Sequence, residues 1–577
     1  MNPCRKAHGG NRNDGRISYR IKEKFAELSY AARDAVRPEG SGSMKRMRRL
    51  VICLAVLAVI CSLAAPASLQ AQSPARRGNL VMATRGSAEP ASMDGQVDPY
   101  AMTWLLNSFV ADPLVMLTAA GEYKPWLASG WSISPNGQIW TLRLRRDVKF
   151  QDGTPFNAEA VKFNIERVMN PETRSALMAN YLGVKNYQKV EVVNDSTVKL
   201  YYGAPVPTVL WGLSIFPIWS PAAVRKFGRD FHQNLVGTGA FKMAQWVKGS
   251  HVRFTRVPTY SGGPPAQEHT GAAYLDSVTI KWVGEDAVLG EVLRSGEVNF
   301  VMELPAQVLG SYKNNPEFQV VAGYQPGAGL QFVMNTSRPP LDDVRVRRAL
   351  RYAYDQDRMN QSLYDGNYVV VKGPVTKYTR CYWKGAEEAY RFDPERSKTL
   401  LEEAGWRVNT RTGIREKDGR PASITIVMLH HKEIGEYLGT QFRNIGVELR
   451  VEVVPGPVQL QRAAAGQFDL MYERLRSFEP DDLYSMWYSQ NNFPGGWAWS
   501  RFQDATLDQT LQRTQFTADP RERCRLFTDA QRMITEQAVQ MPTLDNPIYY
   551  AMHKSVKGFK LGAFGAWFFV KDMYVER

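Results

Sequence analysis

A short segment, His430-His431-Lys432, could hold a metal ion or an anion. Adjacent residues of a strand point to opposite faces of its sheet, so the two imidazoles are not expected to converge on one ion. No cysteine or acidic cluster accompanies them. We therefore predict no metal site and no cofactor. We interpret His431 or Lys432 as a contact for an anionic group of a ligand.

Motifs of secreted hydrolases are missing from the sequence. It contains no G-x-S-x-G nucleophile elbow and no H-E-x-x-H zinc motif. The glycine-rich run from Val236 to Lys242 lacks the G-x-x-x-x-G-K-[ST] pattern of a phosphate-binding loop. Acidic residues are plentiful, but no pair stands out as a general acid and base. We therefore do not expect an enzyme.

The stretch from Trp126 to Arg167 gives the clearest local pattern. Trp140, Leu142 and Leu144 alternate with polar residues, which predicts a half-buried strand after a turn at residues 135–137. Asn157 is expected to cap a helix whose buried face carries the residues Val161, Ile165 and Val168.

Other segments predict further elements. We expect a helix over Ala101–Val110 and a hairpin over Val190–Tyr202. Asp393-Pro394 and Asp519-Pro520 each combine a helix cap with a proline at the first helical position. A further helix is expected to open at Asp342.

Several of these segments resemble the family 5 solute-binding proteins, the dipeptide, oligopeptide and nickel receptors of ABC importers. The resemblance is carried by residues 126–167, by FDPERSKTLLEEAGW and by RNIGVELRVEV, and it extends from Asn79 to Tyr550 in the same order. It implies an α/β fold, a periplasmic-binding-protein-like two-lobed clamshell with mixed sheets and an extra inserted subdomain. It also implies that the glycines of residues 236–242 serve backbone geometry.

The resemblance further implies how the chain divides. One lobe would be discontinuous and would carry the inserted subdomain, and the other would be continuous. Chain crossings near Gln331 and Tyr549 would act as hinges, because a few residues at element ends can absorb a closure. The expected ranges are 72–330 plus 550–577 for lobe I, about 116–235 for the inserted subdomain, and 331–549 for lobe II.

Arg476 is the main departure from the family pattern. Peptide-binding members carry an aspartate for the ligand's amino terminus just before a turn that corresponds to Glu479-Pro480-Asp481, and Arg476 stands at that position. A guanidinium repels an ammonium and prefers carboxylate or phosphate. The solute would then be anionic, opine-like or a sugar phosphate, or would bind in another pose. Alternatively, Arg476 pairs with Glu473 or Glu479.

The resemblance points to further ligand contacts. Trp497 and Trp499 stand where the family places cleft residues, and their spacing would put both on one face of an extended segment, although both could equally belong to the core. Met93 and Asp94 lie in a segment similar to the family's first cleft loop.

The N-terminal region has the layout of an export signal. Residues 44–71 hold a basic start, an apolar run and small residues up to Ala71, which predicts a cleaved signal peptide. Ile60 precedes Cys61, where a lipoprotein signal needs a small residue, so we expect a periplasmic protein without a lipid anchor. Residues 1–43 are expected to be a non-native or disordered extension, with translation starting at Met44; N-terminal sequencing of the precursor would test this.

Charge and cysteine content limit the possible partners. The net charge of +15 is concentrated in residues 1–49, which hold 13 Lys or Arg against 5 Asp or Glu, so nucleic-acid binding is not expected. Cys381 and Cys524 are the cysteines of the folded body, and two free thiols are the simpler expectation. We expect a monomer that binds a small molecule or peptide and docks on ABC permease subunits of the inner membrane.

Three functions are therefore weighed. The first is the extracytoplasmic component of an ABC importer that captures a peptide or peptide-like solute. The alternatives are a receptor for an opine, sugar phosphate or other non-peptide solute, and a peptide-binding chaperone or sensor without a transporter. A secreted hydrolase is disfavoured, and turnover of a trial substrate would support that alternative. A fold alone does not name the ligand, because different sites occur on one scaffold.

Overall fold

The computed structural model describes residues 78–576 apart from 99–100, 120, 265–268, 476–478, 492–495, 518, 563–564 and 566. The predicted signal peptide, the extension before it and Arg476 therefore lie outside the described residues. Within the described ranges, no helix combines the length and the apolar character needed to cross a membrane.

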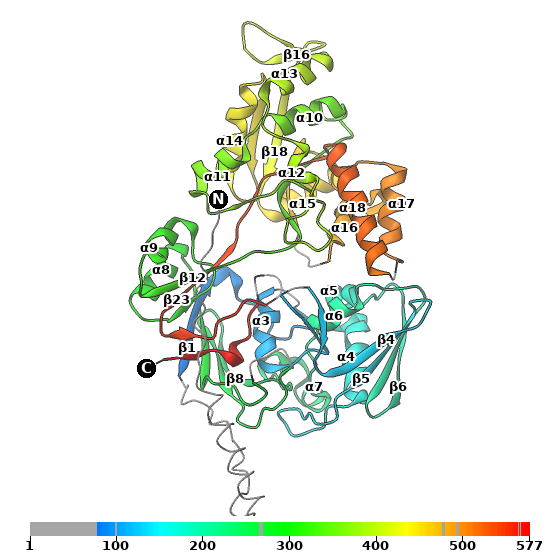
Figure 1. The fold of residues 1–577 in the computed structure, drawn as a ribbon, viewed down its shortest axis with the longest axis vertical. Coiled ribbons are helices and arrows are strands. Elements are labelled where there is room, and N and C mark those ends of the chain that lie inside the picture. The colour runs from blue at the N-terminus through cyan, green and yellow to red at the C-terminus, as the bar shows by residue number, and fades with distance from the viewer. Residues whose placement is uncertain are drawn as a thin grey trace, which may run out of the picture. The chain divides into compact units, whose positions relative to one another are not determined.

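A seven-stranded mixed sheet is built from segments far apart in the sequence (Figure 1). Strands β10 and β11 flank β1 in parallel, and β23 returns from near the C-terminus to pair antiparallel with β11 and β12. In order across the sheet the strands are β12 (Phe318–Gly323), β23 (Ile548–His553), β11 (Phe300–Val301), β1 (Asn79–Arg85), β10 (Ser277–Val283), β9 (His251–Arg256) and β8 (Phe241–Val247).

A second, five-stranded mixed sheet is built from the middle of the chain. Strand β18 pairs in parallel with β19 and β20, whereas β13 pairs antiparallel with β20 and β21. All seven residues of β13 are buried, as in a strand covered on both faces. In order the strands are β19 (Glu448–Val453), β18 (Ser423–Met428), β20 (Leu470–Leu475), β13 (Ala328–Met334) and β21 (Gln540–Pro542).

A four-stranded antiparallel sheet lies in the segment between β1 and β8. Trp140, Leu142 and Leu144 of β5 are buried, which confirms the predicted half-buried strand. The hairpin predicted over Val190–Tyr202 is also confirmed. In order the strands are β4 (Ala128–Ile133), β5 (Ile139–Leu144), β7 (Thr197–Tyr202) and β6 (Tyr187–Asn194).

Helices and short strands surround these sheets (Figure 1). The helices are α3 (Ala101–Val110), α4 (Ala158–Met169), α5 (Ala176–Tyr181), α6 (Val209–Ile215), α7 (Pro221–Phe227), α8 (Asp286–Arg294), α9 (Leu309–Lys313), α10 (Val344–Tyr352), α11 (Gln356–Tyr364), α12 (Ala386–Ala389), α13 (Pro394–Glu403), α14 (Lys432–Arg443), α15 (Gly456–Ala465), α16 (Asp482–Trp487), α17 (Ala505–Thr514) and α18 (Pro520–Glu536). The short strands are β2 (Val115–Leu117), β3 (Tyr123–Pro125), β14 (Val369–Val370), β15 (Arg407–Val408), β16 (Arg415–Lys417), β17 (Arg420–Pro421), β22 (Leu544–Asp545), β24 (Val556–Lys557) and β25 (Tyr574–Val575).

The chain passes twice between the two large sheets. It leaves the seven-stranded sheet after β12 and enters the five-stranded sheet at β13, through residues 324–327. It returns through residues 546–547, between β22 and β23. The predicted crossing points, Gln331 and Tyr549, lie in β13 and β23, near these connections. The division into lobes and the hinge role stay predictions.

Helix caps form where the sequence predicts them. The Asn157 side chain accepts a hydrogen bond of 2.9 Å from the backbone N–H of Ala160. Asp393 and Asp519 each accept one of 2.8 Å, from Arg396 and Glu522. The helix expected to open at Asp342 is instead capped by Asp343, whose carboxylate accepts from the N–H of Arg345 at 2.8 Å. A short polar side chain one position later makes the bond, which moves the helix start by one residue.

Gly237 and Gly239 lie where the backbone presses on the end of α3. A Cβ atom on Gly237 would stand 2.3 Å from the carbonyl oxygen of Val110, and one on Gly239 would stand 2.5 Å from the Val110 carbonyl carbon. The Gly239 N–H donates to that same carbonyl oxygen at 2.7 Å. A larger residue at either position would push the two segments apart. The glycines therefore permit a close approach of two backbone segments, which is the backbone role expected for residues 236–242.

Cys381 and Cys524 form a disulfide, with 5.1 Å between their Cα atoms. The expectation of two free thiols was therefore wrong. The two cysteines are 143 residues apart, and only the packing of α18 against the segment after Arg380 brings them together. Sequence spacing carries no signal for such a contact.

Candidate functional site

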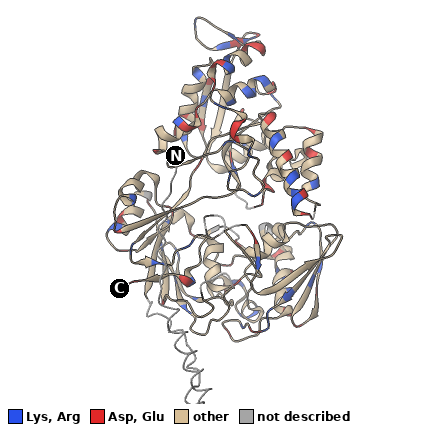
Figure 2. Ribbon diagram, in the orientation of Figure 1, with Lys and Arg blue, Asp and Glu red and all other residues tan. Residues whose placement is uncertain are grey.

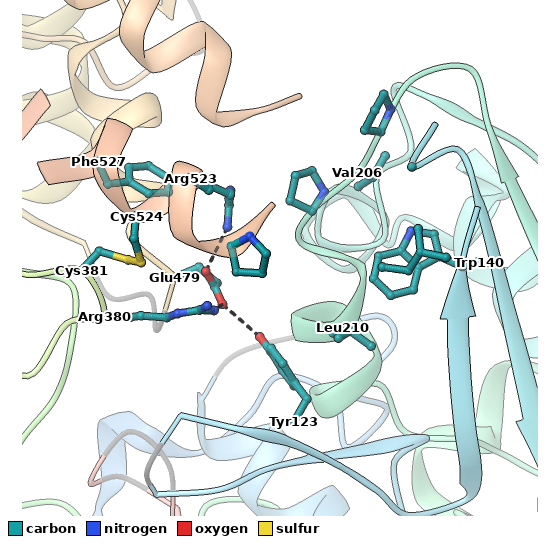
Figure 3. Close-up of a pocket in the computed structure, with 15 residues that line it drawn as sticks. Tyr123, Trp140, Val206, Leu210, Arg380, Cys381, Glu479, Arg523, Cys524 and Phe527 are labelled. Atoms are coloured by element: carbon teal, nitrogen blue, oxygen red, sulfur yellow. Dashed lines mark hydrogen bonds and ion pairs between the residues drawn. A yellow bond between two sulfur atoms is a disulfide. The ribbon is translucent and has the colours of Figure 1, made fainter. Parts of the chain in front are cut away.

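A crevice of about 170 Å³ opens between two parts of the chain (Figure 3). On one side lie Tyr123 of β3, Trp140 of β5 and the segment from Pro205 to Leu210. On the other side lie residues near the five-stranded sheet. These are Arg380, Cys381, Glu479, Pro520, Arg523, Cys524 and Phe527. The crevice is thus the place where residues between β1 and β8 meet the part of the chain that contains α18.

Glu479 is the centre of the contact across this crevice. Its carboxylate is buried, yet it accepts hydrogen bonds from three side chains. Oε1 accepts from the hydroxyl of Tyr123 at 3.2 Å and from Nη1 of Arg380 at 3.1 Å. Oε2 accepts from Nη1 of Arg523 at 3.0 Å. Charged and neutral donors therefore saturate a buried carboxylate, and one of them, Tyr123, comes from the opposite side (Figure 3).

Arg523 ties Glu479 to the next acid along the chain. Its Nη2 donates to both carboxylate oxygens of Asp481 at 2.7 Å, and its Nε donates to the carbonyl oxygen of Thr514 at 3.0 Å. Burial alone would lower the pKa of Arg523, but Asp481 and Glu479 raise the pKa above its ordinary value. The guanidinium is therefore held as a cation with every direction of its planar fork in use.

The charges around Glu479 also affect Tyr123. Burial and then the negative charge of Glu479 raise the pKa of Tyr123 well above its usual range. The phenol therefore stays protonated, and its hydroxyl donates a hydrogen bond to the carboxylate. The disulfide stands beside this group, because Cys381 follows Arg380 and Cys524 follows Arg523 in sequence. It joins the two segments that supply the guanidinium groups to Glu479.

His431 and Lys432 lie elsewhere, at the start of α14. Nδ1 of His431 is 3.2 Å from Oε1 of Glu433 and 3.3 Å from the hydroxyl of Tyr364. Burial lowers the pKa of His431 below its ordinary value, so the ring is a poor partner for an anion at neutral pH. Lys432 is exposed and pairs with Glu436 at 2.7 Å. Among the described residues, no three His, Cys, Asp or Glu side chains gather so as to hold a metal ion.

Met93 and Asp94 lie in the interior. Met93 is fully buried. Asp94 accepts from Nη2 of Arg167 at 2.6 Å and from Nε1 of Trp219 at 2.9 Å. These bonds anchor the loop before α3 to α4 and to the segment before α7. In this structure Asp94 is occupied by protein partners.

Trp497 and Trp499 stack on each other with ring centroids 5.0 Å apart. Trp499 is 3% exposed and belongs to the core around α16 to α18, whereas Trp497 is 40% exposed. The two indoles thus do share a face, with one in the core and one at the surface. Of this pair, Trp497 is the one open to a ligand.

Sequence reasoning did not single out Tyr123, Arg380 or Arg523. The turn Glu479-Pro480-Asp481 was noticed, and the helix start at Asp519-Pro520 was predicted. No sequence pattern links that turn to Arg523, however, because the contact joins residues 44 apart in the chain. Lys and Arg are interspersed with Asp and Glu over the described residues, without a stripe of one sign that would mark a site (Figure 2).

Three comparisons relate this chain to known proteins. Residues 122–496 match the family described as Bacterial extracellular solute-binding proteins, family 5 Middle. The Glutathione-binding protein GsiB of Salmonella choleraesuis is 28% identical over 488 residues, 80% of this chain and 89% of that protein.

Two solved structures share the fold. NikA from Brucella suis, in complex with Fe(III)-EDTA, has a TM-score of 0.74 at 23% identity, covering 87% of this chain and all of that one. DppA from Helicobacter pylori, in complex with the peptide STSA, has a TM-score of 0.68 at 22% identity, covering 87% of this chain and 99% of that one.

Proposed function

Because the chain belongs to the family 5 bacterial extracellular solute-binding proteins, we propose that it captures a peptide or peptide-like solute outside the cytoplasm and delivers it to an ABC permease. The match over residues 122–496 carries this proposal. The similarity to a glutathione-binding relative, which spans 89% of that protein, supports a small peptide-like solute.

The protein acts by binding and makes no change to the solute. In this proposal it is a periplasmic monomer, released after cleavage of residues 44–71, with no lipid anchor and no nucleic-acid partner. Lobe I comprises 72–330 and 550–577 and lobe II comprises 331–549, with the inserted subdomain near 116–235. Two large sheets joined by two short connections support this division, since a hinge needs few crossing strands.

The contact between Tyr123 and Glu479 supports a closing motion. It joins the inserted subdomain to the turn after β20 through one hydrogen bond of 3.2 Å. A single hydrogen bond from a neutral donor to a carboxylate, worth about 1.5–3 kcal/mol, is weak enough to break and re-form during a binding cycle. The two arginines on Glu479 come from the same side as Glu479 and would keep that carboxylate neutralised after opening.

Native mass spectrometry of the chain from residue 72 onward tests the function. Protein incubated with a small-molecule extract of bacterial cells should retain one low-mass compound. Thermal denaturation with the same compound should then give a higher midpoint, because a solute that binds only the folded state stabilises it. Retention of no compound, or conversion of the retained compound to a product, would contradict the proposal.

A further inference from the structure

A second glutamate of the same segment, Glu473, is buried in very different surroundings. It lies on β20 and is 1% exposed. Neither of its carboxylate oxygens has a hydrogen-bond partner among the described residues. An ionised carboxylate buried without donors is strongly unfavourable, so an acid at such a position requires a reason.

Two glutamines with unused polar atoms share its face of the sheet. Gln331 of β13 stands directly opposite Glu473, and Gln540 of β21 stands opposite Val333, two residues further along β13. Residues opposite one another, or two apart on a strand, project to the same side. Oε1 of Gln331 and both side-chain polar atoms of Gln540 are buried without a partner in the described part of the chain. Three side chains thus leave hydrogen-bonding capacity in one buried place.

The group is positioned near the passage between the two large sheets. Glu473 lies two residues before the end of β20, and that end pairs with Ala328, where the chain enters the five-stranded sheet. Helix α16 covers the same face, because Nε2 of Gln331 is 3.8 Å from the sulfur of Met486. Glu473 therefore lies close to the passage that, in the proposed receptor, separates the two lobes.

Asp482, the first residue of α16, connects this group to the opposite lobe. Burial and then the charge of Asp482 raise the pKa of Glu473 well above its ordinary value. Burial and then the same charge raise the pKa of Tyr181 in α5 to about 12. The negative potential at α16 therefore reaches both sides of the space between the lobes.

Tyr181 belongs to a cluster of aromatic rings around α5. The Tyr181 ring packs edge-on against Trp104 at 6.1 Å and against Trp211 at 6.0 Å between centroids. Trp211 in turn stacks on Trp567 at 5.9 Å. The face of an aromatic ring attracts a positively charged group, so a cluster of rings near the charge of Asp482 is compatible with a cationic solute.

We propose that Glu473, assisted by Gln331, binds a positively charged nitrogen group of the solute, an ammonium or a guanidinium. This inference rests on the proposed function and names the chemistry of its solute. The cation supplies the N–H donors that the described residues do not offer to the buried carboxylate and to the amide oxygen of Gln331.

Calorimetric titration with matched probes tests the inference. The probes are glutathione and N-acetylglutathione, trialanine and N-acetyltrialanine, and arginine and citrulline; the second of each pair lacks the cation. The chain from residue 72 onward should bind at least one cationic probe about tenfold or more tightly than its neutral partner. Glu473→Gln should lose about tenfold or more of that affinity, together with the preference for the cation.

Two controls separate binding from folding. Glu395→Gln removes an exposed glutamate on α13 that pairs with Lys398, and it should bind like the wild type. Without solute, Glu473→Gln should melt no lower than the wild type, since the carboxylate accepts no hydrogen bond from the described residues that the change could remove. A core role for Glu473 predicts the opposite pattern, with lower melting and unchanged binding.

Three outcomes would overturn the inference. One is a Glu473→Gln variant that binds the cationic probe as tightly as the wild type does and still prefers it to the neutral probe. Another is a wild-type protein that binds the neutral probes more tightly than the cationic ones. If none of the six probes binds, the charge of the compound captured from the extract tests the inference. A captured compound without a positive charge refutes the inference but leaves the proposed function intact. Capture of no compound refutes the proposed function, and this inference falls with it.

Discussion

Two buried glutamates stand six residues apart in the chain and have opposite surroundings. Glu479 is saturated by Arg380, Arg523 and Tyr123, whereas both oxygens of Glu473 lack a partner among the described residues. Burial is nearly the same, at 4% and 1% exposed. The difference therefore lies in the donors around each carboxylate.

The comparison separates a structural carboxylate from one that awaits a partner. Around Glu479 the protein supplies its own cationic donors, so the buried carboxylate is compensated without a ligand. Around Glu473 the described residues supply no hydrogen-bonded cation, so the acid is unfavourable in the empty protein. Asp112 lies between these cases, since its carboxylate accepts from the neutral donors Tyr260 and Thr238, each at 3.0 Å.

The largest expected effect comes from breaking the saturated site. Arg523→Met keeps much of the side-chain volume but leaves Glu479 buried without its main cation. The free energy of unfolding in urea should fall by about 3–5 kcal/mol. Arg525→Met is the matched control, because Arg525 is exposed and solvent screens its ion pairs with Glu522 and Asp529, so this change should have little effect on stability. Equal losses in the two variants would remove the special role of Glu479.

Loss of the disulfide should have the next largest effect on stability. Replacing Cys381 and Cys524 together by serine should lower the free energy of unfolding by about 2–5 kcal/mol, because the bond closes a long loop. A reductant should lower the stability of the wild type toward that of the variant and leave the variant unchanged. If the reductant affects both proteins equally, the bond is not the cause.

The pH dependence of stability tests the surroundings of Asp112, whose carboxylate accepts from the neutral donors Tyr260 and Thr238. Burial raises the pKa of Asp112 from 3.8 to about 7. The folded state therefore holds a proton that the unfolded state has lost, and the free energy of unfolding should fall as pH rises from about 4 to about 7. At about 1.4 kcal/mol per pKa unit, the fall should be at most about 4 kcal/mol.

Asp112→Asn is the matched variant for this measurement. It keeps an acceptor toward Tyr260 and cannot ionise, so the difference in unfolding free energy between wild type and variant should change across this pH window. A constant difference between pH 4 and pH 8 would show that Asp112 titrates near its ordinary pKa.

The smallest effect concerns the contact across the crevice. Tyr123→Phe removes one neutral donor from Glu479 while both arginines remain, so the free energy of unfolding should fall by about 1.5–3 kcal/mol. A double-mutant cycle with Glu479→Gln isolates the pair, and its coupling energy should be of the same order. A coupling energy of zero would mean that this hydrogen bond does not hold the two sides together.

Local elements were predictable because their signals are local. The helix Ala101–Val110 has the predicted bounds, and the caps at Asn157, Asp393 and Asp519 form as expected. Each depends on side-chain spacing within a few residues. The pairing of β23 with β11 and β12 is different in kind, because it joins segments more than 200 residues apart, and no local pattern indicates it.

The site was less predictable than the fold. His431, Lys432, Met93 and Asp94 were chosen by type or by resemblance, and their surroundings depend on partners far away in sequence. Asp94, for example, is bound by Arg167 and Trp219. The sequence likewise contains no sign that Glu479 is neutralised and that Glu473 is not, since both are single glutamates in one short segment.

The amino-acid sequence by itself determined the family, the fold class and most of the local elements, because alternation, caps and turns act over short distances. Only the tertiary structure decided that Cys381 and Cys524 are bonded and which buried carboxylates have donors. The physical reason is that the ionisation and pairing of a side chain depend on every group within a few ångströms, and folding brings those groups from all parts of the chain.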